Sequence, residues 1–214
     1  MAILQHPNIS DRVYEILSQQ IINHKLKPGS RLREKQLAEQ FGVSRTPLRD
    51  ALNRLAQDGF VTIEPRKGAS IKEFNIDDVR EVYDIRMALE GLAARLAATK
   101  PDIRQLEKLK AQFVKSDTRT LLRADTDLHD LVVSSSGYKK LEGILNNIYN
   151  LIQAFRAAGY ASKKRSTKAS SDHLKIIKAI MDHDQEAAEN LMRNHIEKTK
   201  QEILRNITGG EQKQ

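Results

Sequence analysis

Apolar residues recur at intervals of three and four in three short segments near the start of the chain, which is the spacing of one helix face. Ser10 or Asp11 is a suitable N-cap for the first segment, and Ser44 for the third. Gly42 permits a tight turn between the second and the third. The pattern predicts three helices, at about 11–24, 34–41 and 45–58.

Two short runs of β-type residues follow these helices. They are Phe60 to Ile63 and Ala69 to Ile71, and the basic turn 65–68 separates them. Three helices followed by a basic hairpin is the pattern of a winged helix-turn-helix. We expect this N-terminal domain to span residues 1–74.

From residue 75 onward the pattern is helical. The expected helices are at about 76–98, 102–115, 118–135, 139–157, 170–182 and 185–206. The polar stretch 159–171 is expected to be a loop, and 208–214 a disordered tail. The predicted fold class is therefore mainly α: an N-terminal winged helix-turn-helix with a small β-hairpin wing, then a C-terminal all-α helical bundle at 75–207.

Charge and composition limit the classes of partner that this chain is expected to bind. The chain has 36 Lys+Arg against 28 Asp+Glu among 214 residues, for a formal net charge of +8. An excess of positive charge favours an anionic partner, usually nucleic acid. Cysteine is absent, and we find neither an export signal nor an apolar run of the roughly 20 residues that span a bilayer. A cytoplasmic protein without a membrane partner is expected.

The start of the third predicted helix carries polar residues that suit DNA contact. Arg45 and Arg49 are four residues apart and so share one helix face, and arginine can bind guanine through two hydrogen bonds. Solvated surface charge is the better explanation of any single arginine, but it explains the ordered set poorly. The candidate DNA-binding residues are Lys35, Ser44, Arg45, Thr46, Arg49, Arg66, Lys67 and Gly68.

The stretch Leu32 to Ile71 resembles the DNA-binding head of the GntR family of bacterial transcription regulators. The matching positions are Leu37-Ala38, Phe41 through Arg49 (FGVSRTPLR), Ala51-Leu52, Leu55, Asp58-Gly59 and the wing through Gly68. The resemblance implies that Arg45, Thr46 and Arg49 read the operator, with Lys35 and Gly68 also contacting DNA. Lys35 stands where arginine is commoner.

Four ligand-type side chains have spacings that could close one metal site: Asp125, His129, His173 and His195. The first two are one helical turn apart and face the same way. The last two are each eleven residues from Asp184, so an antiparallel helical hairpin turning there would bring them level. Imidazole and carboxylate ligands suit a divalent zinc, nickel or manganese ion, and zinc is our first expectation. The other histidines, His6, His24 and His183, are expected to be solvated or hydrogen-bonded.

Residues 76–206 resemble the FCD effector domain of the FadR-type branch of the same family. Tyr83, Arg86, Leu89-Glu90, Ala93 and Leu96 to Ala98 match its first helix, and the Asp–His pair and the two later histidines match its metal ligands. The resemblance implies a divalent metal that helps to bind a small carboxylate effector. Leu128 and Tyr138 depart from the family pattern beside this site.

Arg86 lies on the apolar stripe of its helix, and a buried guanidinium needs an anionic partner. Glu90, one turn on, could form an internal ion pair with it. Alternatively, Arg86 binds the carboxylate of the effector. The residues alone leave both possibilities open.

The combined hypothesis is a homodimeric repressor, not an enzyme. Its binding to an inverted-repeat operator in double-stranded DNA would be controlled by a small organic acid or sugar acid at the metal site. One alternative is a metal-dependent enzyme fused to a DNA-binding head, although no motif places a base beside the ligands. Another is a constitutive dimeric repressor with a purely structural metal.

Overall fold

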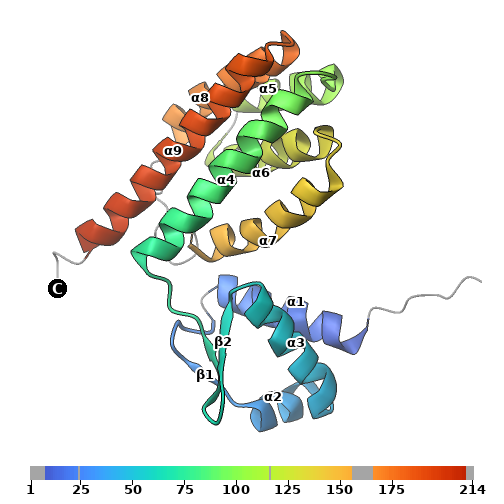
Figure 1. Cartoon of the computed structure of the whole chain (residues 1–214), viewed down its shortest axis with the longest axis vertical. Helices are drawn as coiled ribbons and strands as arrows, with labels where there is room; N and C mark the ends of the chain where they lie inside the picture. The colour runs from blue at the N-terminus through green and yellow to red at the C-terminus, as the bar shows by residue number, and fades with distance from the viewer. Residues whose placement is uncertain (1–7, 24, 116, 156–165, 211–214) are drawn as a thin grey trace, which may run out of the picture. The chain divides into compact units, whose positions relative to one another are not determined.

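The computed structural model describes residues 8–210 except His24, Ser116 and residues 156–165. The chain divides into two compact units (Figure 1). The first comprises Met1–Asn75 with Tyr149–Gly159, and the second Ile76–Ile148 with Tyr160–Gln214.

The first unit holds three helices and a small antiparallel sheet. Its elements are α1 (Ile9–Ile22), β1 (Arg31–Leu32), α2 (Glu34–Phe41), α3 (Arg45–Gln57), β2 (Val61–Glu64) and β3 (Gly68–Ile71). The strand order is β1-β3-β2, and Ser70 of β3 lies opposite both Arg31 and Thr62. The predicted winged helix-turn-helix is confirmed, with β2 and β3 as the wing.

One apolar core explains why these helices form. Leu17 of α1, Leu48 of α3 and Phe60, just before β2, are completely buried in it. Gly42 ends α2 with φ 63° in the left-handed region, so the chain can turn directly into α3. Ser44 occupies the predicted N-cap position of α3, although its side chain makes no capping hydrogen bond.

The start of α1 and the strand β1 differ from the prediction. Helix α1 begins at Ile9 with Asn8 at its N-cap, so Ser10 and Asp11 lie inside the helix and neither caps it. Ile9 is 54% exposed, so it adds nothing to the buried stripe from which the helix was predicted. Strand β1 was not predicted, because two residues are too few to show an alternating pattern.

The regular elements of the second unit are all helices in its described residues. Its helices are α4 (Ile76–Ala97), α5 (Ile103–Lys115), α6 (Thr118–Ser135), α7 (Lys139–Phe155), α8 (Ser166–Met181) and α9 (Gln185–Gly210), with the end of α7 assigned to the first unit. The long helices α4 and α9 lie side by side (Figure 1). They run antiparallel, since Asp84 pairs with Lys200 and Arg95 with Glu189. None of the described helices is long and apolar enough to cross a membrane.

Two predictions for this unit were wrong at their edges. Helix α8 begins at Ser166, so residues 166–171 are helical although a loop was predicted there, while residues 159–165 lie outside the described part of the chain. Helix α9 continues to Gly210, so 208–210 are not the start of a disordered tail, and 211–214 are not described. Both extensions are polar or glycine-rich, which hides them from an apolar pattern. Glycine costs only about 1 kcal/mol in a helix, and a helix that is already formed propagates readily.

Candidate metal centre and DNA-binding surface

The four predicted ligand residues come together from three helices of the second unit. Helix α6 supplies Asp125 and His129, α8 supplies His173, and α9 supplies His195. All four are buried, with at most 8% of any residue exposed. One ligand-type atom from each lies within 4.8 Å of the others, so the two pairs predicted from spacing meet in one cluster.

Two of the distances within this cluster match those between ligands of one metal ion, and a third is longer. Nε2 of His173 is 3.1 Å from Oδ1 of Asp125 and 3.2 Å from Nε2 of His195. Nε2 of His129 is 3.9 Å from the same Asp125 oxygen. Ligand atoms about 2.0–2.2 Å from a shared ion lie about 3–3.6 Å from one another. Nε2 of His129 is buried without a hydrogen-bond partner among the described residues, as expected of an atom that ligates a cation.

Burial also keeps one histidine in the form that ligates metals. It lowers the pKa of His195 well below its ordinary value, and the neighbouring His173 and His129 lower it further, while Asp125 acts in the opposite direction. His195 is therefore neutral near pH 7, with a lone pair available. The ring of Phe113 packs 4.7 Å from that of His173 and gives the cluster an apolar wall.

A charged pair on α4 adjoins the cluster. Nε of Arg86 donates to Oε1 of Glu90 at 2.5 Å, and the two side chains are 2% and 0% exposed. The internal ion pair, one of the two alternatives for Arg86, is therefore present. The other Glu90 oxygen contacts Nδ1 of His129, a contact that was not predicted. Burial alone would raise the pKa of Glu90, but Arg86 and His129 outweigh it and lower the pKa to about 2.

Tyr83 adds a buried hydroxyl to the same face of α4. The residue is fully buried, and its hydroxyl has no hydrogen-bond partner among the described residues. The guanidinium of Arg86 lies 5.6 Å from the centre of its ring. Buried polar atoms are nearly always hydrogen-bonded, so this hydroxyl indicates that the interior beside Arg86 suits a water molecule or a polar ligand.

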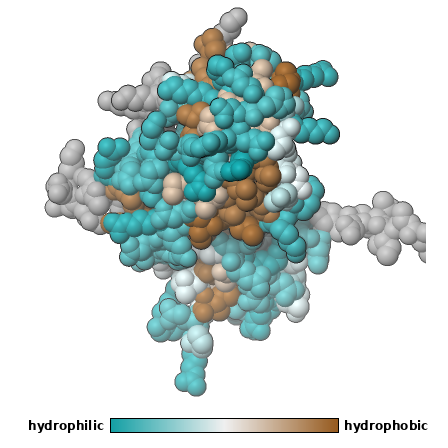
Figure 2. Space-filling model, turned by 45° about the horizontal axis from the view of Figure 1, so that its top comes forward, coloured by the Kyte–Doolittle hydropathy of each residue, from teal (hydrophilic) through white to brown (hydrophobic). Residues whose placement is uncertain are grey.

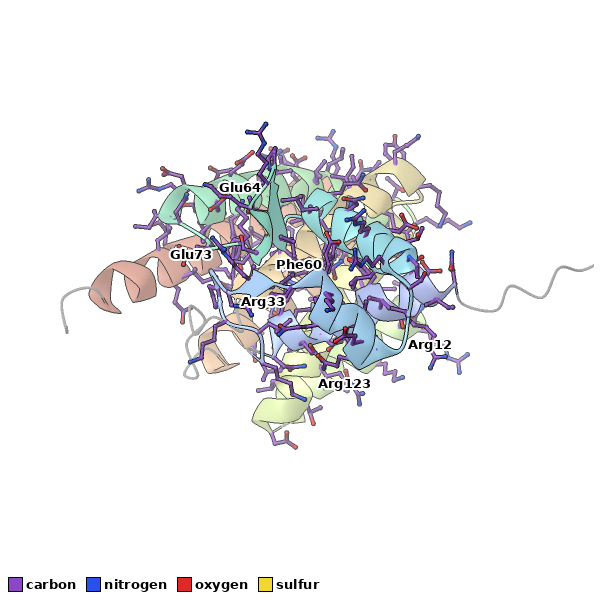
Figure 3. The ribbon with its side chains drawn as sticks, turned by 90° about the horizontal axis from the view of Figure 1, so that it is seen from below. Arg12, Arg33, Phe60, Glu64, Glu73 and Arg123 are labelled. Carbon is purple, nitrogen blue, oxygen red and sulfur yellow. The ribbon has the colours of Figure 1, made fainter. Side chains whose placement is uncertain are left out.

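The candidate DNA-binding residues all lie on exposed positions of the first unit. They are on α2, at the start of α3 and at the tip of the wing: Lys35, Ser44, Arg45, Thr46, Arg49, Arg66, Lys67 and Gly68. Nε of Arg49 is 2.8 Å from Glu34, and Nζ of Lys67 is 2.6 Å from Glu64. Gly68 has φ 88°, which a side chain would disfavour. Figure 3 labels Arg33 and Glu64, which lie near this surface on the β1–α2 connection and on the wing.

A brace between α1 and α3 supports the recognition helix, and it was not predicted. The Tyr14 hydroxyl donates to Asp58, and Arg54 pairs with Asp11. The Arg54 guanidinium also lies 4.6 Å from the centre of the Tyr14 ring. Burial, followed by the hydrogen bond to Asp58, raises the pKa of Tyr14. These contacts tie α3 to α1 at the end of α3 that is farther from the candidate DNA-binding residues.

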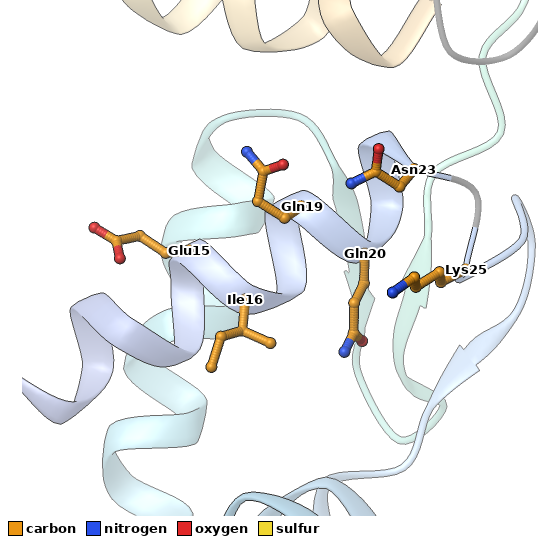
Figure 4. Close-up of a pocket in the computed structure, with 6 residues that line it drawn as sticks. All are labelled: Glu15, Ile16, Gln19, Gln20, Asn23 and Lys25. Atoms are coloured by element: carbon orange, nitrogen blue, oxygen red, sulfur yellow. The ribbon is translucent and has the colours of Figure 1, made fainter.

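A depression of about 340 Å³ lies along α1 (Figure 4). It is lined by Glu15, Ile16, Gln19, Gln20, Asn23 and Lys25. None of these residues is buried, so the depression lacks the desolvated polar groups of a built ligand site.

A winged helix-turn-helix with an exposed basic recognition helix, joined in one chain to an all-helical unit, defines a class of two-domain DNA-binding transcription regulators. The model of the bacterial regulatory proteins of the gntR family matches residues 9–71, and that of the FCD domain matches residues 81–198. The chain belongs to the GntR family and is a transcriptional regulator of the GntR/FCD type.

Relatives and solved structures agree with this assignment. The HTH-type transcriptional regulator YdhC of Bacillus subtilis is 32% identical over 85% of each chain. The HTH-type transcriptional repressor RspR of Escherichia coli is 26% identical over 91% of this chain and 89% of its own. A GntR regulator from Rhodococcus sp. RHA1 has a similar fold, with TM-score 0.74 and 21% identity over 91% and 97% of the two chains. The Zn²⁺-bound FCD domain of TM0439 matches 63% of this chain and 97% of its own, with TM-score 0.54 and 18% identity.

Proposed function

We propose that this regulator is a homodimeric repressor whose affinity for an inverted-repeat operator is set by a small carboxylate or sugar acid. The effector binds at a divalent metal held by Asp125, His129, His173 and His195. The observation that carries the proposal is the convergence of these four buried side chains within 4.8 Å. RspR is named a repressor, and TM0439 has a zinc-bound FCD domain, which supports both parts.

The metal would be zinc, nickel or manganese, since imidazole and carboxylate ligands suit all three. Its chemical contribution would be a fixed positive charge that attracts a carboxylate. Arg86 would supply a second positive group for the same ligand. A guanidinium is planar and can bind a carboxylate through two parallel hydrogen bonds. The Tyr83 hydroxyl is a further polar group that a ligand could reach.

Operator binding would use the exposed surface of the first unit. Arg45, Thr46 and Arg49 would contact bases in the major groove, because they lie at the start of the recognition helix. Residues at the edges of this surface would contact the DNA backbone and an adjacent groove; these are Lys35, Ser44, Arg66, Lys67 and Gly68.

Dimerisation is supported by apolar surface on the second unit. Ile85 and Leu92 of α4 are 42% and 37% exposed, and Ile144 of α7 is 51% exposed. Figure 2 shows hydrophobic side chains gathered on one face of the molecule. Ile85 and Leu92 are two helical turns apart and share one face of α4, and a two-fold dimer would match an inverted-repeat operator.

Metal analysis combined with DNA binding tests the proposal. Metal per chain is measured in the wild type and in His173→Ala and His195→Ala. Affinity for DNA selected in vitro from a random pool is then measured with and without EDTA, citrate, lactate or gluconate. His183→Asn is the matched control, because His183 lies outside the cluster at φ 59°, a conformation that asparagine tolerates.

We expect about one metal per chain, lost in both alanine variants and kept in the control, and an acid that weakens DNA binding only when metal is present. Wild-type protein that takes up no divalent metal would refute the metal site. Metal binding without any effect of the acids or of EDTA on DNA affinity would favour a structural metal. Metal-dependent conversion of an acid would favour an enzyme.

A further inference from the structure

Glu90 is the acidic residue that connects the four-residue cluster to Arg86. We propose that Glu90 is a positioning residue: it holds His129 in the form that can ligate a metal, and it links that histidine to Arg86. This inference rests on the proposed metal site, to which Glu90 itself contributes no ligand.

The contacts of Glu90 extend beyond its ion pair with Arg86. Its side chain is 0% exposed, and its two oxygens have different partners. Oε1 accepts from Nε of Arg86, one turn along α4, while Oε2 contacts Nδ1 of His129 on α6. A charge pair needed only to satisfy Arg86 would not have to reach a second helix.

The contact with His129 determines which nitrogen faces the cluster. An ionised carboxylate can only accept hydrogen bonds, so Nδ1 of His129 must carry the hydrogen. In the neutral ring, Nε2 then keeps its lone pair, and Nε2 is the atom that lies 3.9 Å from Asp125 and lacks a hydrogen-bond partner among the described residues. A carboxylate behind a ligating histidine both orients the ring and increases its basicity.

The same carboxylate couples His129 to Arg86, because a change in its hydrogen bond to one residue affects its hydrogen bond to the other. A cation bound at Nε2 would make Nδ1–H a stronger donor and would strengthen its hydrogen bond to Oε2. The hydrogen bond between Oε1 and Arg86 must respond, because both oxygens belong to one rigid group. Metal occupancy would therefore alter the contact of the residue proposed to bind the effector.

Glu90→Gln tests the positioning role. The amide has nearly the same shape, but when its oxygen stays on Arg86 its NH₂ faces Nδ1 of His129. The ring would then have to accept at Nδ1 and carry its hydrogen on Nε2. We expect affinity for Zn²⁺ and Ni²⁺, measured by competition with a chromophoric chelator, to fall about 10–100-fold. The visible absorption of the Co²⁺-loaded protein should also change, because one nitrogen ligand is lost or displaced.

Glu189→Gln is the matched control. Glu189 on α9 pairs with Arg193 at 2.9 Å and is 20% exposed, yet it is not among the partners of the histidine cluster. We expect unchanged metal affinity in this variant. Wild-type affinity and an unchanged Co²⁺ spectrum in Glu90→Gln would overturn the positioning role. A wild type without metal affinity would instead refute the proposed function.

NMR of ¹⁵N-labelled wild-type protein provides a test that needs no stable Glu90 variant. In metal-free protein we expect His129, assigned with a His129→Gln sample, to carry its hydrogen on Nδ1. Adding Zn²⁺ should shift the Nε–H signal of Arg86, assigned with Arg86→Lys. A hydrogen on Nε2 of His129 would contradict the proposal. An Arg86 Nε–H chemical shift that stays unchanged when Zn²⁺ binds would also contradict it.

Discussion

Replacing Arg86 by methionine should destabilise the helical unit strongly. The substitution keeps much of the apolar stem but removes the charge that faces Glu90, whose side chain is 0% exposed. Breaking a buried ion pair by removing one partner costs about 3–5 kcal/mol, because the other charge stays buried. His129 still contacts the second Glu90 oxygen, so we expect the low end, about 3 kcal/mol.

The assay is urea unfolding followed by circular dichroism, with EDTA present so that bound metal does not contribute to stability. Arg95→Met on the same helix is the control: Arg95 is 53% exposed and lies 3.4 Å from Glu189. Such a surface pair contributes less than about 1 kcal/mol. Because two units can unfold separately, the comparison uses the transition of the helical unit.

A double variant, Arg86→Met with Glu90→Gln, separates charge from packing. If the cost comes from an uncompensated carboxylate, neutralising Glu90 should recover half or more of the lost stability. The coupling energy between the two positions should then exceed about 1 kcal/mol. Arg86→Met with near wild-type stability, or two independent and additive losses, would refute this account of the buried pair.

Two further predictions concern DNA reading and helix packing. Arg45→Ala should weaken specific operator binding by about 1–3 kcal/mol if the side chain reads a base, measured by fluorescence anisotropy; equal losses on specific and random DNA would argue for a phosphate contact instead. A Cβ at Gly91 would lie 2.8 Å from Cγ of Arg193, so Gly91→Val should cost about 1–3 kcal/mol through overpacking, and adding Arg193→Ala should relieve it. Thermal unfolding in EDTA checks this, and a loss that Arg193→Ala leaves unchanged would locate the strain elsewhere.

Local patterns were sufficient to predict most of the architecture. The helix-turn-helix, the wing and each of the two ligand pairs depend on intervals within one helix or one hairpin, such as the step from Asp125 to His129. The α8–α9 turn behaved as expected, since it brings Nε2 of His173 within 3.2 Å of Nε2 of His195. Segments without an apolar stripe, such as β1 and the first turn of α8, could not be predicted in this way.

The role of Glu90 required tertiary information. Glu90 and His129 are 39 positions apart in sequence, and no local spacing relates α4 to α6. The sequence indicated Glu90 only as a partner for Arg86, and a guanidinium can bind both oxygens of a carboxylate, so nothing local pointed to the histidine on α6. The Tyr14–Asp58 hydrogen bond in the first unit was missed for the same reason, because the two residues are 44 positions apart in sequence.

The four clustered residues reach their site as two preassembled halves. Asp125 and His129 are already adjacent once α6 has formed, and His173 and His195 are brought level by one local helical hairpin. Each half alone is a weak two-ligand site, so tight binding requires the hairpin to dock against α6. Metal uptake during folding should therefore be nearly all-or-none and late, which would make retention of the ion a reporter of a correctly assembled helical unit.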